Sequence, residues 1–225
     1  MPIFFDLDDT LINHGLASRQ AALEIYESYK TEINSSPRQP YTSEQFIKAL
    51  QERHIIRFEQ YLRGELTFQE QREARFRDVF GSNLSEGKIE KAVSQWMNSY
   101  RNHWQLFSDV LPCLDRLAEH QLGIITNADR EQQLDKLTAT GIINYFSAII
   151  CSSDYSFSKP DERIFREACR QMNCDPKQIY FIGDNLEKDA RASARAGMRG
   201  IWLNRYGKEK AADVEMIGSL DELVI

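Results

Sequence analysis

The chain has 225 residues, of which 42% are hydrophobic and 28% are charged, so it can bury a sizeable core. Its formal net charge is −6 and it contains no basic run, which makes a nucleic-acid polymer a poor candidate partner. We find no signal peptide before the first predicted strand, and no apolar stretch approaches the ~18 residues of a membrane span.

The cysteines are scattered, without a C-x-x-C pair or the spacing of a disulfide framework. They are Cys113, Cys151, Cys169 and Cys174. This usage favours a reducing compartment, and we expect a cytoplasmic protein that has no membrane partner. Small anionic substrates are compatible with the negative net charge. A local cluster of hydrogen-bond donors or a metal ion can attract an anion although the protein as a whole is negatively charged.

The chain opens with a short apolar run, residues 2–8, that predicts a buried parallel strand. Three acids, Asp6, Asp8 and Asp9, lie within four positions at its end. Carboxylates this close together repel one another and resist burial, so a compensating group is expected beside them. Asp9 is interpreted as a residue that shapes the loop, and Thr10 as one that orients Asp8.

Residues 14–105 show helical patterns and no convincing strand. The segments T-S-E-Q at 42–45 and T-F-Q-E at 67–70 match the capping box and predict helix starts. Farther along, large side chains recur at helical spacing and predict a packed core face rather than a cofactor site. They are Ile89, Val93, Trp96, Met97, Tyr100 and Trp104.

After residue 105, short apolar runs alternate with helical patterns. The runs predict strands at 122–126, 147–151, 179–184 and 200–204, and the patterns predict helices at 110–120, 129–139, 161–172 and 186–196. Such alternation indicates an α/β fold, a Rossmann-like parallel sheet covered by helices on both faces.

Residues 14–105 are therefore an α-helical insertion after the first strand, longer than ordinary loops. Ligands of open α/β sheets bind beyond the carboxyl ends of the strands. We accordingly interpret 14–105 as a cap domain that covers this end, and 1–13 with 106–225 as the catalytic core domain.

Polar residues follow four of the predicted strands at equivalent places. They are Asp6 and Asp8, Thr126 and Asn127, Lys159, and Asp184 with Asp189. Parallel strands bring these ends to one edge of the sheet. Clustered carboxylates tolerate one another around a divalent cation, and an all-oxygen set suits Mg²⁺ better than zinc.

The remaining groups at these strand ends suit a phosphate. A hydroxyl, a lysine and backbone N–H groups bind its peripheral oxygens. A carboxylate that the metal leaves available can attack phosphorus, and a second one can move the proton. The residue types thus predict Mg²⁺-assisted phosphoryl transfer.

Four sequence motifs carry a family resemblance. D-x-D-x-T-L at 6–11, T-N at 126–127, S-K-P-D at 158–161 and G-D-N-x-x-x-D at 183–189 resemble the motifs of the haloacid dehalogenase-like (HAD) superfamily, in the same order and in register with the strands. The helical insertion resembles the cap of the subgroup that includes phosphoglycolate phosphatases and nucleotidases.

The resemblance implies a role for each matching residue. Asp6 is the nucleophile and a metal ligand, and Asp8 is the general acid/base and a ligand through its backbone carbonyl. Thr126 and the backbone N–H of Asn127 hold the phosphate. Lys159 neutralises charge on Asp6 and the phosphoryl group, Asp184 binds Mg²⁺, and Asp189 holds the metal site directly or through water.

We therefore expect a Mg²⁺-dependent phosphatase for a small phosphomonoester of the nucleotide, sugar phosphate or phosphoglycolate type, acting through an aspartyl-phosphate. A phosphomutase shares every motif and stays open. A haloacid dehalogenase fits less well, because halide is a good leaving group and gains little from an acid at Asp8. We expect the partner to be a small phosphorylated metabolite and the protein to be a monomer or a homodimer.

Non-enzyme alternatives fit the sequence less well. A receiver-like signalling module is shorter, has no helical insertion after its first strand, and accepts its phosphoryl group on a later strand. A phosphate-binding protein without activity would lack at least one of the residues that chemistry needs, and Asp6, Asp8, Lys159 and Asp184 are all present.

Overall fold

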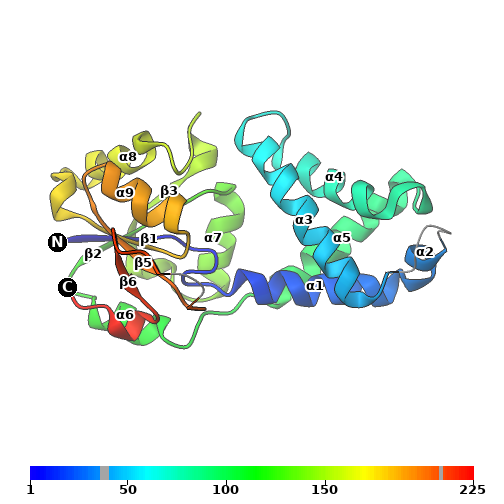
Figure 1. Cartoon of the computed structure of the whole chain (residues 1–225), viewed down its shortest axis with the longest axis horizontal. Coiled ribbons are helices and arrows are strands. Elements are labelled where there is room, and N and C mark those ends of the chain that lie inside the picture. The colour runs from blue at the N-terminus through cyan, green and yellow to red at the C-terminus, as the bar shows by residue number, and fades with distance from the viewer. Residues whose placement is uncertain (36–40, 208–209) are drawn as a thin grey trace. The chain divides into compact units, whose positions relative to one another are not determined.

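The computed structural model describes residues 1–35, 41–207 and 210–225. They form two compact units, one from Met1–Asn13 with Gln105–Ile225 and the other from His14–Trp104. The first unit is a sheet with helices and the second is helical (Figure 1). Within the described residues, no helix is long and apolar enough to cross a membrane.

The first unit contains one sheet of six strands in the order β3-β2-β1-β4-β5-β6. The strands are β1 (Pro2–Phe5), β2 (Gln121–Thr126), β3 (Phe146–Cys151), β4 (Tyr180–Gly183), β5 (Arg199–Leu203) and β6 (Glu215–Ile217). Every pairing is parallel. The strand order reverses between β1 and β4, as in Rossmann-like sheets, so the predicted fold class is confirmed.

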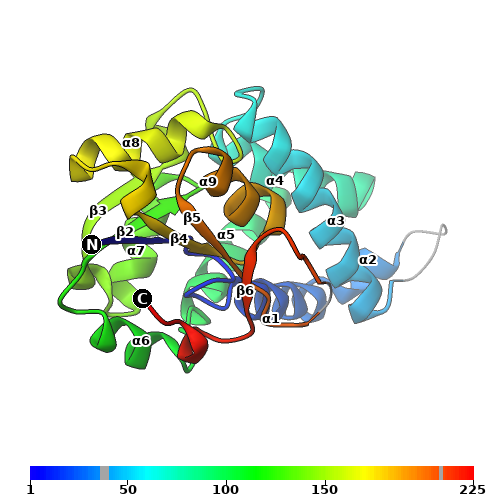
Figure 2. The ribbon, with the colours of Figure 1, turned by 60° about the vertical axis from the view of Figure 1, so that its left-hand side comes forward.

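Consecutive residues of β1 belong to two different cores. Ile3 and Phe5 pack with residues of α6 (Val110–Arg116) and α7 (Arg130–Ala139). Phe4 packs with residues of α8 (Glu162–Met172) and α9 (Ala192–Arg195). This alternation follows from the two-residue period of a strand. Helices therefore cover both faces of the sheet, as the views in Figures 1 and 2 show.

Four elements differ from the prediction. The helix predicted at 110–120 ends at Arg116. The first strand ends at Phe5, so Asp6 and the acids after it follow the strand. β6 was not predicted, because a three-residue strand with a single buried side chain has no detectable period. The region 186–196 begins as a π-helix (Leu186–Arg191), in which the carbonyl of Asn185 accepts the N–H groups of both Asp189 and Ala190.

The second unit consists of α1 (His14–Ser28), α2 (Lys30–Asn34), α3 (Ser43–Leu62), α4 (Phe68–Phe80) and α5 (Glu86–Asn102). Both predicted capping boxes are present, with Thr42 bonded to Gln45 and Thr67 bonded to Glu70. The predicted stripe is also confirmed. Its first five side chains are buried in the core of this unit, and Trp104 packs against that core.

Candidate active site

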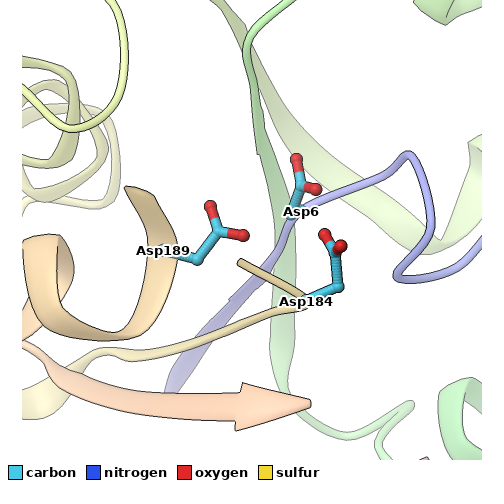
Figure 3. A group of neighbouring side chains, drawn as sticks. All are labelled: Asp6, Asp184 and Asp189. Atoms are coloured by element: carbon cyan, nitrogen blue, oxygen red, sulfur yellow. The ribbon is translucent and has the colours of Figure 1, made fainter. Parts of the chain in front are cut away.

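Three carboxylates gather at the point where the strand order reverses. Asp6 follows β1, Asp184 follows β4, and Asp189 lies in the π-helix after β4. Each offers an oxygen atom, and these three atoms lie within 4.8 Å of one another. Figure 3 shows the carboxyl groups around one common space. The hydrogen bond from the Asp6 N–H to the carbonyl of Ile182, 2.8 Å long, holds Asp6 against the end of β4.

Burial makes this cluster electrostatically costly. Asp6 and Asp189 are only 7% and 1% exposed. Burial, opposed by the charge of Lys159, raises the pKa of Asp6 to about 7. Burial, with the negative charges of Asp6 and Asp189, raises the pKa of Asp184 to about 9. The cluster therefore needs positive charge to be fully ionised near neutral pH.

Lys159 supplies part of that charge. Its Nζ lies 2.7 Å from Asp6 Oδ1 and 2.7 Å from Asp189 Oδ1, and the residue is 3% exposed. Burial alone would lower the pKa of Lys159, but Asp189 and Asp6 outweigh this effect and raise it. The lysine is therefore held in its charged form between the two acids.

Asn127 fixes the backbone that carries this lysine. Its Nδ2 donates to the Lys159 carbonyl at 2.7 Å, and its Oδ1 accepts the Lys159 N–H at 2.8 Å. The side chain of Asn127 thus joins the end of β2 to the loop after β3. Its backbone N–H, which the sequence assigns to phosphate binding, is not part of this pair of bonds.

The loop after β1 is tied to the end of β4. The backbone N–H of Asp184 donates to Thr10 Oγ1 at 3.1 Å, and Thr10 is fully buried. The Thr10 hydroxyl is therefore engaged with Asp184, and its expected role of orienting Asp8 stays a prediction. Asp9 has a φ of 58° and its N–H donates to the carbonyl of Ile12, a geometry that closes the loop.

Gly183 allows Asp189 to lie close to the end of β4. A Cβ atom on this glycine would lie 2.4 Å from Asp189 Oδ2. The same oxygen accepts the N–H of Asn185 at 2.9 Å. The side chain of Asn185, not that of Asp184, caps the following helical turn, so the carboxylate of Asp184 is not used as a helix cap.

Asp8 contacts two residues that the sequence analysis did not single out. Lys136 Nζ lies 2.5 and 2.7 Å from its two oxygens, and Gln133 Nε2 donates to Oδ2 at 3.1 Å. Gln133 also donates to Thr126 Oγ1 at 2.9 Å. The sequence gives only a weak signal for these two residues. Gln133 and Lys136 are polar, yet their spacing places them on the same helix face as Leu137, which is buried in the core.

The family profile of the haloacid dehalogenase-like hydrolases matches residues 3–203. The chain belongs to this family. Human N-acylneuraminate-9-phosphatase is 26% identical to it over 98% of this chain and 91% of the human protein. The glyceraldehyde 3-phosphate phosphatase of Methanothermobacter thermautotrophicus is 30% identical over 99% of this chain and 94% of its own length. Both relatives are phosphatases, which confirms the predicted enzyme class, a phosphoric monoester hydrolase.

A solved structure also shares the fold of this haloacid dehalogenase-like hydrolase. The putative HAD-hydrolase YfnB from Bacillus subtilis, bound to magnesium, has a TM-score of 0.77 at 21% identity and covers 98% of this chain and 95% of that one. Motif residues separated by more than a hundred positions, such as Asp6 and Lys159, are in contact in the present chain.

Proposed function

We propose that this hydrolase is a Mg²⁺-dependent phosphatase that cleaves a small phosphomonoester through an aspartyl-phosphate on Asp6. The observation that carries the proposal is the surroundings of Asp6, which contacts Lys159 and shares one space with Asp184 and Asp189. The names of the two relatives support a small phosphorylated substrate, because both are phosphatases of such compounds.

The residues fit a magnesium ion. The cluster offers carboxylate oxygens, which Mg²⁺ prefers over nitrogen or sulfur ligands. Asp6 and Asp184 would hold the ion, with the backbone carbonyl of Asp8. Both oxygens of Asp189 already have partners, Lys159 and the N–H of Asn185, so we assign Asp189 to holding the site together through Lys159. A bound Mg²⁺ neutralises charge on the phosphoryl oxygens.

The protein groups account for both halves of the reaction. A carboxylate oxygen of Asp6 forms the bond to phosphorus while the bond from phosphorus to the ester oxygen breaks, and Asp8 gives its proton to that oxygen. Asp8 then takes a proton from water as the water oxygen attacks phosphorus, which releases phosphate and restores Asp6. Lys159, the Thr126 hydroxyl and the Asn127 N–H stabilise the peripheral oxygens.

The test is hydrolysis of p-nitrophenyl phosphate by the purified chain with Mg²⁺ and with EDTA. We expect activity with Mg²⁺, its loss in EDTA, and its loss in Asp6→Asn, while Asp115→Asn on the exposed side of α6 keeps it. Acid-quenched protein should carry a phosphoryl group on Asp6 by mass spectrometry. Full activity in Asp6→Asn would remove the proposed nucleophile.

A substrate panel ranked by kcat/KM would then assign the substrate class. It should include N-acylneuraminate 9-phosphate, glyceraldehyde 3-phosphate, a nucleoside monophosphate, a sugar phosphate and phosphoglycolate. Release of inorganic phosphate separates hydrolysis from a phosphomutase, which would return the phosphoryl group to the sugar.

A further inference from the structure

The carboxylate of Asp8 is held by two buried side chains from one face of α7. Lys136 and Gln133 are both 0% exposed and lie three positions apart, which places them on neighbouring points of the helix surface. Together they make three contacts with the two oxygens of Asp8, at 2.5, 2.7 and 3.1 Å. Three contacts from two directions fix the rotation of a short carboxylate side chain.

The amide of Gln133 has a defined orientation. Beside the Lys136 ammonium, Asp8 lies in its ionised form, which is the form that takes a proton from water in the second half of the proposed reaction. An ionised carboxylate only accepts hydrogen bonds, so the nitrogen of the amide faces Asp8 in this form. That nitrogen also donates to Thr126 Oγ1, and the amide oxygen has no hydrogen-bond partner. Because Gln133 occupies an acceptor position of the Thr126 hydroxyl, the hydroxyl proton is directed toward another acceptor.

A purely structural role explains these residues poorly. Burying a lysine and an amide with an orphan oxygen costs free energy that apolar side chains of similar volume would avoid. The apolar Leu137 on the same helix is buried in the core, so α7 packs on the sheet through this residue without needing a buried lysine or amide. The side chain of Asp8, in contrast, is 27% exposed, so buried anchors hold a carboxylate that remains accessible.

We propose that Lys136 and Gln133 are positioning residues that hold the Asp8 carboxylate in the orientation for proton transfer, and that Gln133 also directs the Thr126 hydroxyl toward the phosphate. The inference rests on the proposed function, because it takes Asp8 as the group that moves the proton. Neither residue contacts the reacting atoms in this scheme, and both act through the side chains they hold.

A double-mutant cycle with Asp8→Asn tests this inference on an alkyl phosphomonoester, whose leaving oxygen needs a proton. We expect Lys136→Met to lower kcat by about tenfold to a hundredfold, within the range of general acid–base catalysis, with KM changed by less than about threefold. In the Asp8→Asn background, the same change should lower kcat by less than about threefold. An equal fold-loss in both backgrounds would overturn the inference.

Isosteric and matched variants separate positioning from folding. Gln133→Glu keeps the volume but places an acceptor against Asp8, so kcat should fall about tenfold, whereas a space-filling role would leave it unchanged. Lys177→Met, an exposed lysine, is the control and should match the wild type. Melting curves identify any variant that is unfolded, and Gln133→Glu then serves in the cycle instead of Lys136→Met.

Proton transfer by Asp8 and positioning of Asp8 by Lys136 and Gln133 are contradicted by different results. If Asp8→Asn keeps the wild-type kcat on the alkyl ester, the proton-transfer part of the proposed function fails. If Asp8→Asn is deficient while Lys136→Met and Gln133→Glu are fully active, only the positioning inference fails.

Discussion

The Nζ atom of Lys159 lies 2.7 Å from a carboxylate oxygen of Asp6, and both residues are more than nine-tenths buried. This lysine offsets one of the three formal negative charges of Asp6, Asp184 and Asp189. Two negative charges therefore remain when all three acids are ionised, which a divalent cation would balance. The arrangement leads to predictions about stability as well as activity.

The first prediction concerns pH and magnesium. Burial raises the pKa of Asp6 to about 7 and, with neighbouring charges, that of Asp184 to about 9, from 3.8 in each case. A carboxyl group whose pKa is raised by folding stabilises the folded state while protonated, and this contribution is lost as pH rises through the folded pKa. Without metal, the free energy of unfolding should fall between about pH 4 and pH 9.

Mg²⁺ should oppose that loss, because it favours the ionised acids. Its stabilising effect should therefore be larger at pH 9 than at pH 5, by on the order of a few kcal/mol. The effect of Mg²⁺ is the difference between the free energies of unfolding in Mg²⁺ and in EDTA, measured by denaturant unfolding between about pH 5 and pH 9. Asp184→Asn should show a flatter pH dependence and a smaller effect of Mg²⁺. The same Mg²⁺ effect at both pH values would contradict the assignment.

The second prediction concerns Lys159→Met. Loss of the ammonium removes a group held against both Asp6 and Asp189, so we expect kcat to fall by about a hundredfold or more. In EDTA, the uncompensated acids should lower the free energy of unfolding by about 3–5 kcal/mol. Steady-state kinetics and denaturant titration check both effects, with Lys177→Met as the control. Wild-type kcat in Lys159→Met would exclude this residue from the mechanism.

The third prediction compares two glycines. In Gly183→Ala, the new methyl group would collide with Asp189, so the free energy of unfolding should fall by about 1–3 kcal/mol and kcat by at least about tenfold. In Gly87→Ala, at an exposed position of α5, a Cβ meets nothing within 4 Å, and stability should rise by about 0.5–1 kcal/mol with unchanged kcat. Identical melting temperatures for the two variants would show that Gly183 is not tightly packed.

The fourth prediction concerns a buried arginine of α4. Arg75 is 5% exposed and lies 4.1 Å from the ring of Trp96, and its Nη1 contacts His54. Its Nε and Nη2 have no hydrogen-bond partner, and no carboxylate of the described residues pairs with it. Burial, with the charge of Arg72, lowers the pKa of Arg75 to about 9. The contacts with Trp96 and His54 therefore compensate only part of the cost of burying the guanidinium.

Arg75→Met keeps much of the side-chain volume without the charge, so the free energy of unfolding should stay equal or rise by up to about 2 kcal/mol. Arg75→Ala should lower it by about 2–4 kcal/mol, because it leaves a cavity beside Trp96. Urea unfolding of both variants measures the difference. A loss of more than about 2 kcal/mol in Arg75→Met would mean that the contacts of the guanidinium outweigh its desolvation.

Much of the fold follows from local patterns. Short apolar runs bounded by turns predict the strands from β1 to β5, and the capping boxes at Thr42 and Thr67 predict helix starts, because each signal involves residues close together in the sequence. The π-helix after β4 was not predictable in this way. It depends on Asn185, whose carbonyl accepts two N–H groups while its side chain caps the turn.

The sequence by itself determined that acids, a threonine, an asparagine and a lysine follow parallel strands, because strand ends and motif spacing are local properties of the chain. The contacts of these residues were decided by the tertiary structure. Lys136 lies 128 positions from Asp8, and Thr10 lies 174 positions from Asp184. Such pairs form only when the sheet brings its strand ends together and buries them, since burial makes an unpaired polar group costly.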